Sequence, residues 1–403
     1  MTDEPETTAT PAHRPGPDAA QPGGAAFSPP SRGKQPRVFV DCRWTRTGTH
    51  DGISRFGASL VEQLHRLHPV TMLIHDERQL ALLPDGVPHV RINHPISVRE
   101  LAVSRTLHAL GADVVFSPMQ VIGGFRRRYR LVLTLHDLIY YRHPAPPSFL
   151  PWPVRLVWRL YHRAYWPQRV LLNRADAVVT VSETTKRLIT EHRLTRRPVT
   201  VVHNAPSGLP DEPIAPAEPA EEPRDLVYMG SFMPYKGVET LLAGMRRLPG
   251  HRLHLLSPIE PRREAELRAQ LPPGADVVFW RGISEADYRA LLGRAAALVT
   301  ASRDEGFGLP VVEAMHAGTP VVCSDLDIFR EVTGGHARFF PPDDADAFAA
   351  AVRELAEPGV RAELVRRGRE QARRFTWERS ARRLLPVLVP SARPDLDGPG
   401  HEG

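Results

Sequence analysis

The stretch Glu305-Gly-Phe-Gly-Leu-Pro-Val-Val-Glu313-Ala-Met-His-Ala-Gly-Thr-Pro320 decides how the rest of this chain is interpreted. A glycine-rich turn follows a short apolar run and leads into an expected helix. Such a turn leaves backbone N–H groups unpaired at the positive end of the helix dipole, where a phosphate binds well. Carboxylates at Glu305 and Glu313 are unexpected there unless they face hydroxyl groups. The stretch therefore predicts a site for a nucleotide sugar, which carries both phosphates and hydroxyls.

Length and composition indicate two soluble domains with flanking segments. The chain has 403 residues, with 42% hydrophobic and 24% charged, which is typical of globular proteins but too long for one ordinary core. Many of the 41 prolines lie near the two ends and in the middle of the chain. We therefore expect a disordered tail over 1–35, a linker over 206–224 and a second tail over 391–403.

The charge balance favours anionic partners without choosing among them. The net charge is +6, mostly from arginine, so nucleotide phosphates, acidic lipids and nucleic acid all remain open. Nucleic acid is disfavoured because no RNA-binding aromatic signature, zinc-ligand spacing or helix-turn-helix pattern occurs. Cys42 and Cys323 each lie beside a predicted strand, which indicates two reduced, buried thiols. Without a signal peptide or an apolar run of membrane length, we expect a cytoplasmic protein.

Strand and helix patterns alternate in two series, as in doubly wound α/β domains. The first series has expected strands at 36–42, 70–74, 113–116, 131–135, 177–181 and 200–202. Its expected helices cover 58–65 and 98–110, and a further helix starts at Ser182 as N-cap. The second series has expected strands at 225–229, 253–256, 277–280 and 297–300, with helices at 238–248 and 285–294. We expect surface helices after Ala345 and over 360–375, and a final amphipathic helix from Thr376.

Two such sheets joined by one linker predict a cleft between facing rims. Functional residues in a parallel sheet gather at the carboxyl ends of its strands, so Gly52, His136 and Ser182 should share one rim. The expected fold class is therefore α/β, with two facing Rossmann-like doubly wound domains and an interdomain cleft. These domains cover 36–205 and 225–378, and the helix over 379–390 is expected to pack back toward the first domain.

From about residue 36 to 389 the chain resembles the retaining, nucleotide-sugar-dependent glycosyltransferases of family 4, which have the GT-B fold. A glutamate pair with seven residues between is weak evidence alone, but the ordered combination of motifs is strong. The motifs are Glu305–Glu313 with Ala314-Met315, Ala317–Val322, Gly230 with Lys236-Gly237, Val202-His-Asn204 and His136-Asp137. The resemblance implies an acceptor-binding first domain and a second domain that binds the sugar donor.

The resemblance also implies three catalytic residues. Lys236 would neutralise the donor diphosphate as a point charge. Glu305 would bind hydroxyls of the transferred sugar, near the positive charge that develops at the anomeric carbon. His136 would touch the sugar and the acceptor side. The implied mechanism is a front-face displacement in which the acceptor proton passes to a phosphate oxygen of the leaving diphosphate.

The implied donor-binding residues surround this centre and include one departure from the family pattern. Glu313 would accept hydrogen bonds from ribose hydroxyls, and backbone atoms would supply most other contacts. The implied set is Gly52, Ser231, Lys236, Ile283, Phe307, Gly308, Leu309 and Glu313. Many relatives have a basic residue where this chain has Ser231, so the Ser231 hydroxyl or another arginine such as Arg55 must assist Lys236.

No metal or other cofactor is expected. The sequences Asp325-Leu-Asp327 and Asp395-Leu-Asp397 imitate the D-x-D metal motif of the other large transferase fold. The first follows the helix of the glutamate pair, which that fold lacks, and the second lies in a tail. We therefore reject both as metal ligands.

The basic, aromatic segment from Trp152 to Trp166 has two interpretations. An ordinary domain helix, with its aromatic face in the core and its arginines in water, is favoured. The alternative is a helix that rests on an anionic membrane surface near a lipid-linked acceptor, which would place the protein peripherally at the inner face of a membrane. Arg126-Arg-Arg-Tyr-Arg130 has the same ambiguity.

The resemblance predicts a hexosyltransferase of polysaccharide or glycoconjugate synthesis. Mannose from GDP-mannose is the first expectation, from the His-Asp and Gly-Ile-Ser-Arg-Phe stretches, and a UDP-hexose is nearly as good. The acceptor would be a hydroxyl of a glycan, a lipid-linked sugar or a small molecule. The alternatives are a phosphorylase or sugar-phosphate synthase on the same fold, and a non-catalytic subunit that partners an active transferase.

Overall fold

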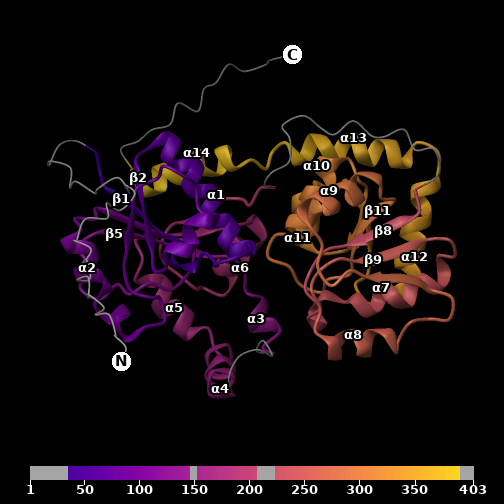
Figure 1. Ribbon diagram of the computed structural model, residues 1–403, viewed down its shortest axis with the longest axis horizontal. Helices are drawn as coiled ribbons and strands as arrows, with labels where there is room; N and C mark the ends of the chain where they lie inside the picture. The colour runs from indigo at the N-terminus through magenta and orange to yellow at the C-terminus, as the bar shows by residue number, and fades with distance from the viewer. Residues whose placement is uncertain (1–34, 146–151, 207–222, 391–403) are drawn as a thin grey trace, which may run out of the picture.

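The computed structural model describes residues 35–145, 152–206 and 223–390 of the chain. These residues form two α/β domains that lie side by side (Figure 1). The expected tails and nearly all of the expected linker fall outside the described residues, as does the Asp395-Leu-Asp397 sequence. Cys42 and Cys323 are both buried and free, one in each domain, as expected.

The first domain is built on a seven-stranded parallel sheet with the order β3-β2-β1-β4-β5-β6-β7. Its strands are β1 (Val38–Asp41), β2 (Val70–Ile74), β3 (His89–Arg91), β4 (Val114–Ser117), β5 (Arg130–Leu135), β6 (Ala177–Thr180) and β7 (Val199–Val201). Helices cover both faces, so the apolar runs at β1, β4, β5 and β6 are buried on both sides. The strand order reverses between β1 and β4, which is where doubly wound sheets bind ligands.

Two helices of this domain differ from the predictions. Helix α1 (Gly52–Leu67) begins six residues before the expected start, because Asp51 caps it by accepting a hydrogen bond from the Ser54 N–H, at 2.8 Å. The expected helix over 98–110 is divided into the 3₁₀ helix η3 (Val98–Ala102) and α2 (Val103–Ala109). The other α-helices in the described part of this domain are α3 (Ile139–Arg142), α4 (Trp152–Tyr161), α5 (Trp166–Asn173) and α6 (Glu183–Glu191), the last capped by Ser182 as predicted.

The second domain repeats the design with a six-stranded parallel sheet, in the order β10-β9-β8-β11-β12-β13. Its strands are β8 (Asp225–Tyr228), β9 (Arg252–Leu255), β10 (Asp276–Phe279), β11 (Ala297–Thr300), β12 (Val321–Ser324) and β13 (Arg338–Phe340). Its helices are α7 (Val238–Gly244), α8 (Pro261–Arg268), α9 (Glu285–Arg294), α10 (Leu309–Ala317), α11 (Asp327–Thr333), α12 (Ala345–Arg353) and α13 (Val360–Ala372). The strand order reverses between β8 and β11, so the loops after these two strands meet at the switch point.

Helix α14 (Trp377–Leu388) leaves the second domain and packs on α1 of the first (Figure 1). Leu384 and Leu388 are fully buried there. Two polar contacts anchor the helix, because Ser380 Oγ donates to the His203 carbonyl at 2.7 Å and Arg130 Nε donates to the Val387 carbonyl at 2.9 Å. The apolar face of this strongly amphipathic helix therefore packs on the first domain, although the helix follows the second domain in the sequence.

Helix α4 agrees only in part with the favoured interpretation of its sequence. It projects from the body of the first domain (Figure 1), and much of its apolar surface faces solvent. The exposed apolar side chains include Trp152 at 75%, Val157 at 64% and Leu160 at 58%. Trp158 packs edge-on against Tyr140 of α3, with ring centroids 4.8 Å apart, and Tyr161 is also partly buried. The core thus takes one narrow stripe of the helix, while Trp152, Val154, Leu156, Val157 and Leu160 remain exposed.

Candidate functional site

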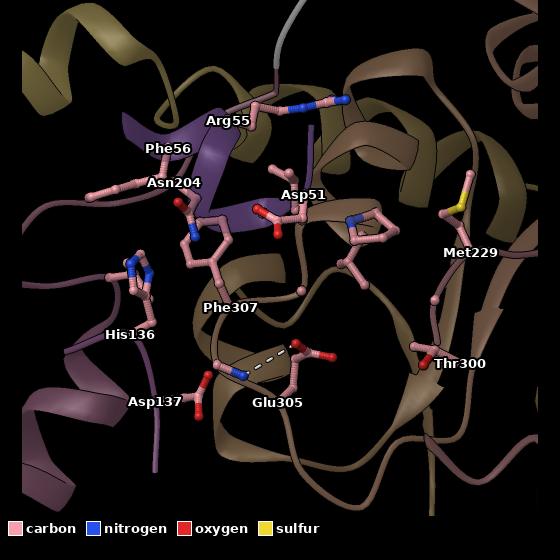
Figure 2. A pocket seen from close by; sticks show the side chains of 18 of the residues that line it. Asp51, Arg55, Phe56, His136, Asp137, Asn204, Met229, Thr300, Glu305 and Phe307 are labelled. Atoms are coloured by element: carbon pink, nitrogen blue, oxygen red, sulfur yellow. Dashed lines mark hydrogen bonds between the residues drawn. The ribbon is translucent and has the colours of Figure 1, made fainter. Parts of the chain in front are cut away.

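A cavity of about 530 Å³ lies between the two domains, at the carboxyl ends of the central strands. Both domains contribute side chains to it, as Figure 2 shows for His136 and Asp137 on one side and Glu305 and Phe307 on the other. Seven residues predicted for the site line the cavity: Gly52, His136, Lys236, Glu305, Phe307, Gly308 and Leu309. The other three, Ser231, Ile283 and Glu313, do not belong to its lining.

Lys236 and Glu305 form an ion pair on the second-domain wall of the cavity. Lys236 ends the 3₁₀ helix η4 (Pro234–Lys236) after β8, and its Nζ lies 2.5 Å from Glu305 Oε2. Gly237 follows with a φ of +62°, and a Cβ there would lie 2.2 Å from the Ala301 carbonyl oxygen. Glycine is therefore required for the loop after β8 to approach the loop after β11 closely enough for this pair.

The start of α10 faces the same cavity and has features of an anion site. Gly308 is its N-cap, with a φ of +86°, which disfavours any other residue. No side chain in the described part of the chain caps this helix. Phe307, Gly308 and Leu309 all line the cavity, so the positive end of the helix dipole is directed at its interior.

Glu313 lies farther along α10, beyond the lining of the cavity, where α10 packs against α9. Its side chain is nearly buried and accepts a hydrogen bond from the Tyr288 hydroxyl, at 2.9 Å. Burial raises the pKa of the Glu313 carboxyl, and the Tyr288 hydrogen bond and Arg55 oppose that rise. A nearly buried carboxylate held by one hydroxyl retains capacity to accept further hydrogen bonds from a ligand.

His136 and Asp137 follow β5 on the first-domain wall. His136 Nε2 lies 2.7 Å from the Pro118 carbonyl, so Nε2 carries the proton and Nδ1 is the acceptor. Burial lowers the pKa of His136, which therefore stays neutral at pH 7. Asp137 Oδ1 accepts a hydrogen bond, 3.0 Å long, from the N–H of Ile139, the first residue of α3. A Cβ on Gly306 would lie 3.0 Å from the Asp137 Cβ, so the two domains are in close contact at this point of the cavity wall.

Several residues of the site were not predicted. Asp304 is 3% exposed, and its Oδ1 accepts a hydrogen bond from Arg142 Nη2 across the domain interface, at 2.7 Å. Burial raises the pKa of Asp304 to about 6. Its position next to Glu305 was the only signal for it in the sequence. Asp304 itself does not line the cavity, whereas Tyr140, Tyr235 and Trp377 do, and Trp377 arrives there only through the return of α14.

The remaining candidates have structural partners. Ser231 is exposed, and its carbonyl accepts a hydrogen bond from the Tyr228 hydroxyl at 2.6 Å. Asp325 pairs with Arg330 at 2.6 Å, and Asp327 pairs with Arg187 of the first domain at 2.5 Å. The loop at Ile283 joins β10 to α9, and Ile283 packs against the apolar core.

Two family descriptions match the chain, one for each domain. The description "Glycosyltransferase Family 4" matches residues 50–205, and "Glycosyl transferases group 1" matches residues 223–358. The chain belongs to glycosyltransferase family 4. Together the two matches cover the loops that form both walls of the cavity, so the predicted resemblance is confirmed.

Curated relatives of this family-4 chain include mannosyltransferases. An MMP alpha-(1->4)-mannosyltransferase of Mycolicibacterium hassiacum is 31% identical over 245 residues, which span 59% of this chain and 59% of the relative. A phosphatidyl-myo-inositol mannosyltransferase of Mycolicibacterium smegmatis is 35% identical over 184 residues, which span 44% of this chain and 47% of the relative. The chain therefore matches about half of the length of these two relatives.

Solved structures confirm the GT-B fold of the family-4 chain. A sucrose-phosphate synthase from Thermosynechococcus elongatus aligns with a TM-score of 0.65 at 22% identity, over 88% of this chain and 98% of that one. Anabaena HepE in complex with UDP and glucose aligns with a TM-score of 0.67 at 18% identity, over 88% and 100% of the two chains. Among the described residues, no helix has both the length and the apolar character needed to cross a bilayer.

Proposed function

We propose that this protein is a retaining glycosyltransferase that moves a hexose, in first place mannose, from a nucleoside diphosphate sugar to a hydroxyl acceptor. The observation that carries the proposal is the grouping of Lys236, Glu305 and the uncapped start of α10 in one interdomain cavity. This grouping offers a cation, a sugar-binding carboxylate and a helix dipole to a single ligand. Mannose is favoured because the two relatives described above are named as mannosyltransferases.

In the proposed mechanism the second domain holds the donor. Lys236 and the N–H groups at the start of α10 stabilise the leaving diphosphate, while Glu313 accepts hydrogen bonds from ribose hydroxyls. Glu305 gives up its ion pair with Lys236 and accepts hydrogen bonds from hydroxyls of the transferred sugar, close to the anomeric carbon. The acceptor hydroxyl attacks from the side on which the diphosphate departs and gives its proton to a phosphate oxygen. His136, neutral and fixed on Pro118, contacts the sugar and acceptor from the first domain.

No divalent metal takes part in the proposed mechanism, because Lys236 and the α10 dipole supply positive charge where the diphosphate would lie. Transfer is therefore expected to continue in excess chelator. Loss of activity in chelator that returns with added Mg²⁺ or Mn²⁺ would contradict this part of the proposal.

The acceptor is proposed to be carried at an anionic membrane surface. Exposed apolar side chains of α4 lie beside the arginines Arg159 and Arg163, a combination that suits the interface of a bilayer with acidic lipids. Tyr140 connects this helix to the cavity, because it lines the cavity and also packs against Trp158 of α4. An acceptor presented near α4 would thus have a short route to the donor.

Ligand-induced stabilisation tests the donor. A ligand at 100 times its Kd adds about 2.7 kcal/mol of stability, which for cooperative unfolding of a chain of about 400 residues raises Tm by about 3 °C. We expect GDP-mannose and GDP to raise Tm, with UDP and UDP-glucose as comparison. Stabilisation by none of the four would overturn the proposal and favour a non-catalytic subunit. NMR of the product would then establish whether the anomeric configuration is retained.

A further inference from the structure

The cavity holds little free positive charge for a nucleoside diphosphate. Among the residues that line it, only Lys236 and Arg55 carry a permanent positive charge, whereas Asp51, Asp137 and Glu305 are acidic. The Lys236 ammonium is already paired with Glu305. Ser231 occupies the loop after β8 without any charge. A second cation would therefore add to the positive charge that Lys236 and the start of α10 offer to the two phosphates.

Arg55 reaches across the cleft from the opposite domain. It lies in the first turn of α1, and its backbone N–H bonds to the Asp51 carbonyl at 2.9 Å. Its guanidinium contacts two acids of the second domain: Nη2 lies 2.8 Å from Glu285 Oε1, and Nη1 lies 3.7 Å from Glu313 Oε1. Figure 2 shows Arg55 extended along the edge of the pocket, beyond Asp51. Its side chain is 22% exposed, so it borders the cavity without being buried in protein.

The two contacts of Arg55 differ in strength. The bond to Glu285 has ordinary hydrogen-bond length, whereas the 3.7 Å approach to Glu313 is too long for a hydrogen bond. One end of the guanidinium is therefore anchored while the other is available to a better acceptor. A phosphate oxygen beside the ribose-binding carboxylate would be such an acceptor, because arginine binds phosphate with short, charge-assisted bonds.

Resting on the function proposed above, we propose that Arg55 binds a phosphate of the nucleotide donor from the facing domain and supplies the charge that Ser231 lacks. Nη1 leaves Glu313 for the phosphate when the donor enters, and Glu313 becomes free to accept the ribose hydroxyls. Nη2 keeps its bond to Glu285. Because Arg55 belongs to the first domain and α10 to the second, phosphate binding would also hold the two domains together.

A purely structural role is the competing explanation. Arg55 and Glu285 bridge the domains, but the Glu285 side chain is 63% exposed, and ion pairs of this kind contribute little to stability. Arg289 pairs with the same acid from within α9, at 3.0 Å, and does not line the cavity. Replacement of Arg289 is therefore a matched control: it removes an ion pair with Glu285, as replacement of Arg55 does, but leaves the residues that line the cavity unchanged.

Calorimetric titration of the full-length protein tests the proposal. The ligands are a nucleoside diphosphate, the matching monophosphate and the free nucleoside. We expect Arg55→Gln to weaken the diphosphate and the monophosphate by about 10- to 100-fold, the usual loss for a charged hydrogen bond. Nucleoside affinity should change less than about twofold, which also shows that the variant is folded. Arg55→Lys should restore part of the phosphate affinity, and Arg289→Gln should resemble wild type.

Two results would overturn the proposal. The first is an Arg55→Gln protein that binds the diphosphate as wild type does. The second comes from Glu285→Gln, which removes the anchor but leaves Arg55 in place. If Glu285→Gln weakened the diphosphate as much as Arg55→Gln, Arg55 would act only through the domain bridge. A wild-type protein that binds no nucleotide would instead refute the proposed function.

Discussion

Lys236 Nζ and Glu305 Oε2 lie 2.5 Å apart, so the cation and the carboxylate of the donor wall neutralise each other in the free protein. Both side chains are partly exposed to the cavity, at 13% and 19%. A donor would separate them, because its diphosphate attracts Lys236 while its sugar hydroxyls attract Glu305. In the free protein each side chain of the pair therefore occupies the position of the ligand group that the other side chain would bind.

Replacing Lys236 with alanine should lower kcat/KM for transfer by about 100-fold or more, since removal of one charge-stabilising donor typically costs this much. Steady-state kinetics with saturating acceptor measures the effect. Lys186→Ala is the control, because Lys186 lies on α6 and pairs with the exposed Glu183 at 3.6 Å. Equal activity of Lys236→Ala and Lys186→Ala would exclude Lys236 from the mechanism.

Asp304 should make stability depend on pH in an unusual direction. Its folded pKa of about 6 lies above the ordinary value of 3.8, so the folded protein binds more protons than the unfolded chain between these values. Stability from this group is therefore full below about pH 4 and is lost as pH rises through about 6. A pKa shift of this size changes the free energy of unfolding by roughly 3 kcal/mol at most.

Asp304→Asn isolates this effect, because asparagine cannot ionise and still offers an oxygen to Arg142. Denaturant unfolding at pH 4.5, 5.5, 6.5 and 7.5 should show wild type losing stability relative to Asp304→Asn as pH rises. Parallel curves for the two proteins would mean that Asp304 titrates normally.

Charged substitutions on α4 should abolish attachment to acidic membranes. Leu156 and Leu160 are 51% and 58% exposed, so Leu156→Glu with Leu160→Glu leaves the core intact while adding two negative charges to the proposed contact. We expect at least a tenfold loss in sedimentation with anionic vesicles at low salt. Val98→Glu, on the exposed helix η3, is the control. The idea fails if wild type does not sediment, or if the α4 variant sediments equally well.

The return of α14 should contribute strongly to stability. Leu384 is fully buried against the first domain, so Leu384→Ala is expected to cost about 2–5 kcal/mol in the free energy of unfolding. Arg383→Ala, at the neighbouring exposed position, should stay within about 0.5 kcal/mol of wild type. Chemical denaturation measures both. A small loss at Leu384 would indicate that α14 is only loosely docked.

Much of the architecture was predictable because it rests on local patterns. Apolar runs and caps predicted β2, α9 and β11 with the bounds that the structure has, and Ser182 is the N-cap of α6 as expected. Helix α1 begins six residues before its predicted start, because Asp51 caps it, whereas Gly52 and Gly57 by themselves favour a loop. The exposure of much of the apolar face of α4 was not predicted, because periodicity reveals an apolar face but not whether anything covers it.

By itself, the sequence determined the two α/β domains and the place of the glycine-rich turn from Glu305 to Leu309 at the cavity, since the alternation of strands and helices and a glycine turn both follow from local patterns. Only the tertiary structure decided which distant residues share the site. It brought Arg142 to Asp304, Arg55 to Glu313 and Trp377 to the cavity wall. These contacts depend on how the two domains face each other and on the path of α14. Both arise from packing between elements far apart in the chain, for which no local pattern exists.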